Sequence, residues 1–395
     1  MLEQRFRVFY RFQSPERTIA EVRLPQNRNF PKSHRAPLTT VCSGNGGSSA
    51  SSKLAAFGEA VERYSYVFQG SETVIIGAER ELEQQCGLLT PRVCNQFTEE
   101  QYAGREAWNA SPLAFPYIPR PVDRDEPIAW TVVWSLTRPE TFLAPAQHCY
   151  FYSNPPTERL VCVADSNGCA AGETMEQAVE HALLELIERD AIALWWTARL
   201  PRPGLVLPEC AEVEDIVSEF TARQRRVWLL DLTTDVGVPV AAAIAAATTG
   251  SARVRVGFGA ALAARRAVLR ALYELRQNEA IHEETPQPDD PHSMHNAHLH
   301  WLKDARLEAN PHFVPQGSGR ILSAAARTNL ESLLRDLADR GWNIYALDLS
   351  RPETKTPAVR LIAPDLAVPY HRFACQRIQQ ALKKGFGPNP APFCL

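Results

Sequence analysis

The five-residue pattern Glu-x-x-Glu-Arg occurs twice in this chain, and both copies lie in segments with the apolar spacing of a helix. The paired acids are Glu59 and Glu62 in the first copy and Glu185 and Glu188 in the second. Carboxylates three residues apart lie side by side on one helix face, so each helix could offer a pair of oxygen ligands. Facing pairs of oxygen ligands suit Mg²⁺ better than zinc. Two ordinary solvated helix faces are the alternative.

The composition predicts a globular protein. Of its 395 residues, 45% are hydrophobic, which is enough for one large or two ordinary domains. A net charge of −3 gives no electrostatic reason to bind nucleic acid or an anionic membrane. The charged N-terminus lacks the features of a signal peptide, and no apolar run approaches the length of a membrane span. We therefore expect a cytoplasmic protein that binds neither nucleic acid nor membrane.

The nine cysteines include no Cys-x-x-Cys pair. Reduced, mostly structural thiols are therefore expected, and neither a zinc knuckle nor a disulfide framework is. A loop near the end of the third long helix carries His282, His292, His295, His298 and His300. Their irregular spacing among prolines favours a variable solvent loop over a metal site.

Hydrophobic periodicity predicts three long helices, at about 52–68, 174–197 and 262–281. Strands are expected at 73–76, 128–137, 160–164 and 253–258, with Pro-rich loops between about 110 and 145. These elements indicate a sheet with helices packed against it.

A helix, a strand, a turn and a second strand recur in the C-terminal half. The first copy has a helix near 210–224 and a strand at 227–232, followed by Val238-Pro-Val-Ala. The second has a helix near 328–340 and a strand at 342–349, followed by Thr356-Pro-Ala-Val. This weak internal duplication favours an α+β chain, with mixed layers of sheets and helices.

Two further polar features accompany the acid pairs. A Gly/Ser-rich loop, residues 43–52, leads into the first long helix and is suited to cradle an anion, although it lacks the Gly-Lys-Ser/Thr of a P-loop. On the third long helix Arg270, Glu274 and Gln277 form one stripe opposite a row of leucines. A flexible connector and a solvent-facing salt-bridged stripe are the alternatives. Together these parts have the chemistry to hold Mg²⁺ and a triphosphate.

Four segments then carry motifs in a fixed order. They are Gly58-Glu-Ala-Val-Glu-Arg-Tyr-Ser65; Ser166-Asn-Gly-Cys-Ala-Ala-Gly172 with Glu176, His181-Ala-Leu-Leu-Glu-Leu-Ile-Glu-Arg-Asp190 and Trp195-Trp196; Arg270-Ala-Leu-Tyr-Glu-Leu-Arg-Gln277; and Pro388-Asn-Pro-Ala-Pro392-Phe-Cys-Leu395. They resemble the motifs of the YcaO family, ATP-dependent enzymes that modify peptide backbone amides, and the last resembles the PxPxP terminus of its azoline-forming cyclodehydratases. The resemblance implies a YcaO-type fold, with an N-terminal segment at 1–40 and a single domain at 41–395.

The resemblance also implies roles for individual residues, with ATP and Mg²⁺ as cofactors. The implied Mg²⁺ ligands are Glu59, Glu62, Glu185 and Glu188. The implied ATP-binding residues are Ser43, Asn45, Lys53, Glu173, Gln177, Arg189, Arg270, Glu274 and Gln277. The proline-rich tail, with Pro388, Pro390 and Pro392, is stiff enough to hold the Leu395 carboxylate in the site as an orienting or basic group.

Two departures from the family pattern concern nucleotide affinity. Asn45 stands where the family usually has lysine, and Lys53 is the candidate to replace that charge. At Glu173 and Gln177 the usual amide and carboxylate are exchanged. The exchange still leaves an acceptor-only group and a mixed donor and acceptor four residues apart.

The implied reaction closes a thiazoline or oxazoline ring. A Cys, Ser or Thr side chain of a ribosomally made precursor peptide attacks the preceding carbonyl, and phosphorylation makes the amide oxygen a good leaving group. The expected partner is a separate leader-binding protein, ubiquitin-activating-enzyme-like or ThiF-like. A flavin dehydrogenase would act afterwards, and a homodimer is left open. The alternatives are a thioamide- or amidine-forming YcaO and a non-catalytic peptide-binding scaffold.

Overall fold

The computed structural model describes residues 6–13, 17–27, 29, 36–111, 116–153, 159–248, 254–284, 305–323 and 328–389. The histidines of the predicted solvent loop from His292 to His300 lie outside these residues, as do Pro390, Pro392 and Leu395. None of the described helices is both long enough and apolar enough to cross a membrane.

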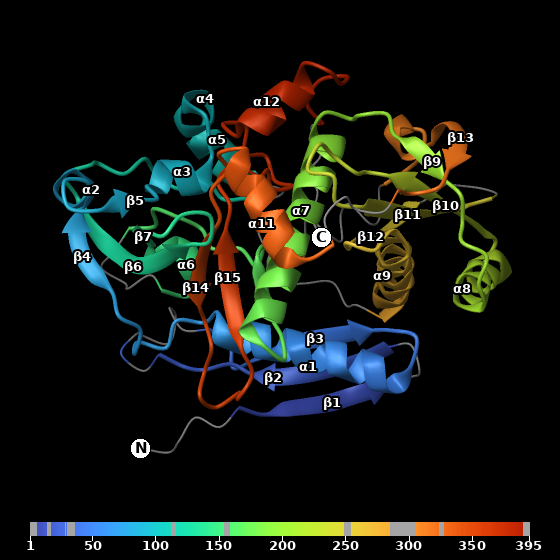
Figure 1. Ribbon diagram of the computed structural model, residues 1–395, viewed down its shortest axis with the longest axis horizontal. Helices are drawn as coiled ribbons and strands as arrows, with labels where there is room; N and C mark the ends of the chain where they lie inside the picture. Colours follow the sequence, from blue (N-terminus) through green and yellow to red (C-terminus); the bar gives the residue numbers. More distant parts are fainter. Residues whose placement is uncertain are drawn as a thin grey trace. The chain divides into compact units, whose positions relative to one another are not determined.

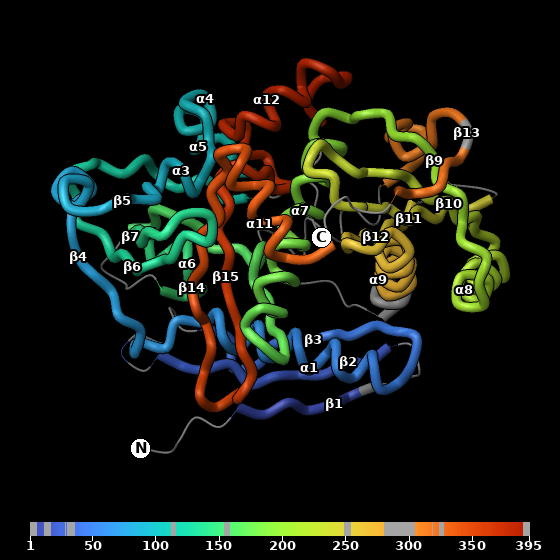
Figure 2. Tube along the Cα trace, in the orientation of Figure 1, coloured from blue at the N-terminus to red at the C-terminus, as the bar shows by residue number. Residues whose placement is uncertain are grey.

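The chain is a mixed α/β protein whose described residues fall into two compact units (Figures 1 and 2). The first unit contains Met1–Arg105, Ile118–Leu183 and Leu334–Pro364. The second contains Glu106–Tyr117, Leu184–Leu333 and Asp365–Leu395. The division of the chain into 1–40 and a single domain at 41–395 stays a prediction.

In the first unit a small antiparallel sheet supports helix α1 (Ser49–Ser65). The sheet has the order β1 (Val8–Gln13), β2 (Arg17–Arg23) and β3 (Thr39–Asn45), and α1 packs against β2 and β3 (Figure 1). Ala20, Val22 and Cys42 are buried on these strands. Gly44 is required where β3 meets α1, because a Cβ there would lie 2.0 Å from the Ser52 carbonyl oxygen.

A larger, seven-stranded sheet completes the first unit. Its order is β5 (Gly87–Leu88), β7 (Thr141–Pro145), β6 (Pro127–Ser135), β14 (Tyr345–Asp348), β15 (Ala358–Ile362) and β8 (Cys169–Ala171), with β4 (Ile75–Ala78) paired to β6. The short helices of this unit are α2 (Glu79–Leu82), α3 (Pro91–Asn95), α4 (Glu99–Ala103) and α6 (Ala146–Cys149). Helix α5 (Arg105–Asn109) begins at the last residue of a first-unit segment and continues into the second unit.

The second unit is built on a five-stranded sheet. Its order is β12 (Val254–Ala260), β11 (Val240–Ala247), β10 (Arg225–Asp231), β9 (Pro203–Leu205) and β13 (Gln316–Arg320). Its helices are α8 (Ala211–Ala222), α9 (Ala264–Glu284), α12 (Gln376–Leu382) and the 3₁₀ turn η2 (Pro311–Phe313). Helices α7 (Met175–Thr197) and α11 (Leu330–Asp339) contribute residues to both units.

The structure confirms the three long helices as α1, α7 and α9. It also confirms the duplication, because α8, β10 and β11 repeat as α11, β14 and β15, and each strand pair is antiparallel. The predicted strand at 160–164 is wrong. The Val161 N–H donates to Gln147 Oε1 at 2.8 Å and the Val161 carbonyl accepts from Asn95 Nδ2 at 2.8 Å, so side chains replace a neighbouring strand. Strand β7 falls in a segment predicted as loop, because it pairs with β6.

Strand β12 and helix α9 approach each other unusually closely. A Cβ on Gly257 would lie 2.1 Å from the Leu275 backbone nitrogen, and one on Gly259 would lie 2.3 Å from the Ala267 carbonyl oxygen. These neighbours are backbone atoms of a helix, so they cannot move aside as a flexible side chain would. The two glycines therefore fix the distance between β12 and α9.

Replacing Gly257 with alanine is expected to lower the free energy of unfolding by about 2–3 kcal/mol, because the methyl group overpacks against α9. Urea denaturation measures this change. Gly58→Ala on α1 is the matched control, since its Cβ meets nothing within 4 Å. That change is expected to stabilise the helix by about 0.5–1 kcal/mol. A Gly257→Ala protein as stable as the wild type would contradict the packing described.

Candidate functional site

In the first unit, α1 presents its acid pair beside the end of β3. Glu59 Oε2 accepts the Ser43 backbone N–H at 2.7 Å, and Glu59 Oε1 accepts Arg63 Nε at 2.8 Å. The second arginine contact, Nη2 to Oε1, is 2.6 Å. Burial, with the charge of Glu59, raises the pKa of the adjacent Cys42 thiol to about 12. Cys42 is therefore a protonated, structural thiol.

The Gly/Ser loop forms an ordered start for α1. Ser48 is the N-cap: its hydroxyl accepts the Ser51 N–H at 3.2 Å, and the Ser51 hydroxyl accepts the Ser48 N–H at 3.0 Å. Asn45 ends β3 opposite Arg17. The loop therefore brings Ser43 to Glu59 and uses its serines near the helix start for capping.

Lys53 lies elsewhere on α1. Its ammonium group sits 4.7 Å from the centre of the Tyr10 ring. Lys53 precedes Glu62 by nine residues, two and a half turns, so the two side chains point to opposite sides of the helix. The structure does not bring Lys53 to the acid pair, and its role toward ATP stays a prediction.

In the second unit, α7 presents the other acid pair, and here the arginine contacts both acids. Arg189 Nη2 lies 3.2 Å from Glu185 Oε1, and Arg189 Nη1 lies 2.7 Å from Glu188 Oε1. One guanidinium therefore bridges both carboxylates of the motif. Glu188 and the flanking apolar residues are buried, and Glu185 is half-buried.

The polar stripe on α9 makes hydrogen bonds to the backbone of β12. Glu274 Oε2 accepts the Phe258 N–H at 3.2 Å, and Arg270 Nη1 donates to the Ala260 carbonyl at 3.4 Å. Asn278 Nδ2 donates to the Val256 carbonyl at 3.0 Å. Within the part of the chain that the structure describes, β12 is the edge strand of its sheet, so these side chains bind backbone groups that a neighbouring strand would otherwise pair. The sequence prediction missed Asn278, although its spacing of eight residues from Arg270 places it on the same stripe.

Glu274 also belongs to the electrostatic surroundings of the α7 motif. Burial raises the pKa of Glu274 to about 7, and the negative charge of Glu188 adds to the rise. Arg189, the Phe258 N–H and Arg270 act in the opposite direction. The structure thus groups the predicted residues Arg189, Arg270 and Glu274 with the second acid pair, while Gln277 lies half-buried on the same helix.

The exchanged residues Glu173 and Gln177 form the start of α7. Gln177 Oε1 accepts the Glu173 N–H at 2.7 Å, and the Thr174 hydroxyl accepts the Gln177 N–H at 3.2 Å. Both Glu173 and Gln177 are exposed. The amide at 177 therefore closes the first turn of the helix, a contact that the motif alone did not predict.

Beyond α7, the chain returns to the C-terminal end of that helix. The Phe386 N–H donates to the Ala198 carbonyl at 3.0 Å, and the Asn389 N–H donates to the Thr197 carbonyl at 2.8 Å. Arg199 Nη2 donates to the Phe386 carbonyl at 2.7 Å. These contacts flank Pro388 and fix the chain directly before the remaining proline-rich residues.

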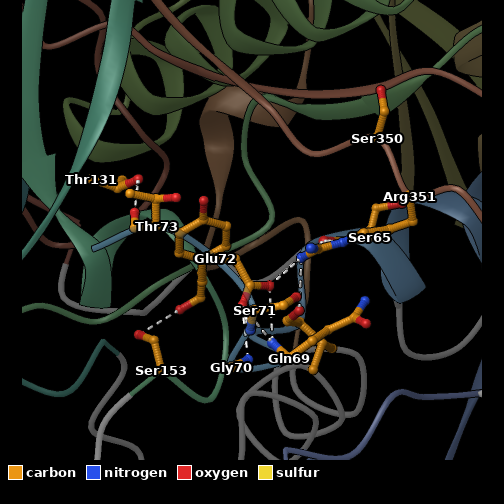
Figure 3. A network of polar contacts seen from close by, with 12 residues as sticks. Ser65, Gln69, Gly70, Ser71, Glu72, Thr73, Thr131, Ser153, Ser350 and Arg351 are labelled. Carbon is orange, nitrogen blue, oxygen red and sulfur yellow. Dashed lines mark hydrogen bonds and ion pairs between the residues drawn. The ribbon is translucent and has the colours of Figure 1, made fainter.

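A buried cluster that sequence reasoning missed holds the other end of α1 (Figure 3). Arg351 donates to the carbonyls of Ser65 at 2.9 Å and Val67 at 3.1 Å, and to Glu72 Oε1 at 2.6 Å. Glu72 in turn accepts the backbone N–H groups of Gln69, Gly70 and Ser71. A cation at a helix C-terminus is stabilised by the helix dipole. The cluster fixes α1 less than one turn after Glu62.

The acid pairs fit Mg²⁺ by their chemistry. Each motif offers carboxylate oxygens, hard ligands that Mg²⁺ prefers to histidine or cysteine. Among the residues that the structure describes, no three His, Cys, Asp or Glu side chains are grouped so that they alone would hold a metal ion. Mg²⁺ commonly takes one or two carboxylates and completes its shell with water and phosphate oxygens. Pairs of glutamates therefore suffice.

Comparison with known proteins identifies the family. The model of the family described as YcaO cyclodehydratase, ATP- and Mg²⁺-binding, matches residues 43–367. A structure titled "Heterocyclase in complex with substrate and Cofactor" is 27% identical, with a TM-score of 0.84 over 98% of this chain and 54% of that chain. The heterocyclase TruD is 30% identical, with a TM-score of 0.73 over 87% of this chain and 50% of that chain. The chain thus spans about half the length of these two proteins.

A third solved structure supports the fold over nearly the whole of both chains. YcaO from Methanopyrus kandleri, bound with AMPPCP and Mg²⁺, is 22% identical, with a TM-score of 0.62 over 98% of this chain and 90% of that chain. At this identity the likeness concerns the fold alone.

The raised pKa of Glu274 predicts a pH-dependent stability difference. Its folded-state pKa lies above the value of about 4.5 expected when unfolded, so its contribution to stability is lost as pH rises from 4.5 through 7. Glu274→Gln keeps the acceptor for Phe258 and removes the charge. The variant is expected to match the wild type at pH 4.5 and to exceed it by roughly 1–3 kcal/mol at pH 8.

Denaturation at a series of pH values measures this difference. Glu219→Gln, on the exposed face of α8, is the control and is expected to show little change. A gain for Glu274→Gln that is equal at all pH values, or largest at low pH, would contradict the assignment.

Proposed function

Because the chain belongs to the YcaO family, we propose that it uses Mg²⁺ and ATP to close thiazoline or oxazoline rings in a ribosomally made precursor peptide. The observation that carries the proposal is the pair of Glu-x-x-Glu-Arg helices, in each of which the arginine holds a carboxylate of its own motif. Peptide amide oxygen is a poor leaving group, so an activating phosphoryl group is chemically required.

Glu59 and Glu62 on α1, with Glu185 and Glu188 on α7, would hold the metal. When bound, Mg²⁺ neutralises the charge of the triphosphate beside these carboxylates. The contact of Ser43 N–H with Glu59 supports this role, because it holds one carboxylate oxygen and thereby orients the side chain. The Arg351 cluster holds the same helix at its C-terminal end.

Arg189 and Arg270 would bind phosphate oxygens. A guanidinium group offers two parallel N–H donors that match the geometry of phosphate. Arg270 is exposed, and its contact with the Ala260 carbonyl is long at 3.4 Å, so a phosphate can replace that carbonyl at small cost. Glu274, held by the Phe258 N–H, would keep both arginines oriented. Positioning and charge neutralisation are then the main contributions of the protein, as in other phosphoryl transfers.

The chain after Asn389 has the reach to bring the Leu395 carboxylate to the α7 acids. Asn389 is anchored at Thr197, which lies nine residues, or roughly 13 Å of helix, beyond Glu188. Six residues in the extended polyproline form span about 19 Å. We propose that the proline-rich tail, with Pro388 beside the anchor and Pro390 and Pro392 beyond it, acts as a stiff spacer that presents Leu395 as an orienting or basic group.

A separate partner would capture the leader region of the precursor. The chain spans about half the length of the two heterocyclases it resembles. We propose a ubiquitin-activating-enzyme-like or ThiF-like protein in that role. A flavin dehydrogenase that oxidises azolines would act on the product.

Mass spectrometry of candidate precursor peptides tests the reaction. Incubated with the chain, its partner, Mg²⁺ and ATP, a precursor is expected to lose the mass of one water for each ring. Glu188→Gln is expected to abolish the loss, and the surface variant Glu219→Gln is expected to retain it. Replacement of oxygen by sulfur would indicate a thioamide instead. An unchanged mass with a precursor and partner of proven competence would contradict an enzymatic function.

A further inference from the structure

The arginine of each Glu-x-x-Glu-Arg motif makes the same backward contact to an acid of its own motif. On α1, Arg63 holds Glu59 with Nε and Nη2 at 2.8 and 2.6 Å. On α7, Arg189 holds Glu185 at 3.2 Å, and it also reaches Glu188. The two motifs lie in different units, and in each the contact has the four-residue spacing of a helix ion pair.

These contacts use the oxygens that a divalent cation would need. The Ser43 N–H and Arg63 together occupy both oxygens of Glu59. Arg189 takes one oxygen from each carboxylate of its motif. Arginine remains charged at any ordinary pH, so it neutralises the acids until another anion binds the guanidinium group. In the absence of a nucleotide, a metal ion must compete with the guanidinium group for these carboxylate oxygens.

A nucleotide changes this competition. Phosphate oxygens offer arginine a bidentate partner of equal geometry and greater charge than a single carboxylate. Side chains of both arginines and both first acids are partly open to solvent, so exchange does not require unfolding. When the guanidinium moves to phosphate, it releases carboxylate oxygens to the cation that the phosphates bring with them.

We propose that Arg63 and Arg189 are built-in counter-ions that keep the acid pairs from binding divalent cations until a nucleotide triphosphate arrives. The arginines thereby couple metal binding to nucleotide binding, and each one changes its partner from glutamate to phosphate. This inference rests on the proposed nucleotide function of the motifs and assigns Arg63 a role that the motif resemblance alone does not give it.

Binding of Mn²⁺, which is visible by electron paramagnetic resonance, tests the coupling. Affinities are measured for Mn²⁺ alone and for the preformed Mn²⁺ complex of AMPPCP, a non-hydrolysable analogue of ATP. The wild type is expected to bind Mn²⁺ alone weakly and Mn·AMPPCP well. Arg63→Gln and Arg189→Gln are each expected to bind Mn²⁺ alone about tenfold more tightly and Mn·AMPPCP about tenfold more weakly.

Two controls separate this effect from a general change in charge or folding. Arg223→Gln removes an arginine with the same four-residue spacing to Glu219 on α8, and it is expected to change neither affinity. Arg63→Lys keeps the charge without the two-pronged contact, so its affinity for Mn²⁺ alone is expected to stay close to that of the wild type. Thermal unfolding confirms that each variant is folded. If the variant of one motif does not fold, the variant of the other motif still tests the proposal.

The two possible failures are distinguishable. If the wild type binds Mn·AMPPCP but neither glutamine variant gains affinity for Mn²⁺ alone, the counter-ion role is wrong and the nucleotide function stands. A wild type that binds Mn²⁺ alone as tightly as the variants also overturns the counter-ion role. If the wild type does not bind Mn·AMPPCP, the proposed function fails and the counter-ion role fails with it.

Discussion

Pairing of buried carboxylates with arginine fixes the helices on which the candidate site depends. Arg351 holds Glu72 at the end of α1 in the first unit. In the second unit Arg377 holds Asp190, on α7, with two contacts of 2.7 Å, while Asp190 accepts the Ala367 N–H. A buried carboxylate is costly unless it is paired and hydrogen-bonded, and the planar guanidinium satisfies both needs at once. Loss of either arginine would leave a buried carboxylate without its charged partner.

The acid pairs of the motifs differ from these structural pairs in exposure. The side chains of Glu72 and Asp190 are 4% and 0% exposed, whereas those of Glu59 and Glu185 are 25% and 24% exposed. Ion pairs that solvent partly reaches have modest strength, while removal of one partner from a buried pair is costly. Arginine–carboxylate pairs therefore stabilise the fold where they are buried, and they can exchange partners where solvent reaches them.

Local pattern was sufficient to predict the helices and the duplication, because apolar periodicity is a property of a short segment. It was insufficient wherever a side chain distant in sequence makes the backbone hydrogen bonds that a neighbouring strand or a helix cap would otherwise make. Residues 160–164 have the composition of a strand, yet Gln147 and Asn95 hold their backbone. The motif predicted Arg270 and Glu274 at a nucleotide, but not their contacts to the edge of β12. Arg351 is far from Ser65 in sequence, so no spacing rule identifies their contact.

Under the proposed function, both Glu-x-x-Glu-Arg motifs bind the same nucleotide. Calorimetry with Mg·AMPPCP and the proteins Glu59→Gln and Glu185→Gln, with Glu219→Gln as control, tests it most directly. One nucleotide is expected to bind per chain, with an affinity that falls at least about tenfold in either motif variant and is unchanged in the control. Wild-type affinity in the Glu59→Gln or the Glu185→Gln protein would contradict it.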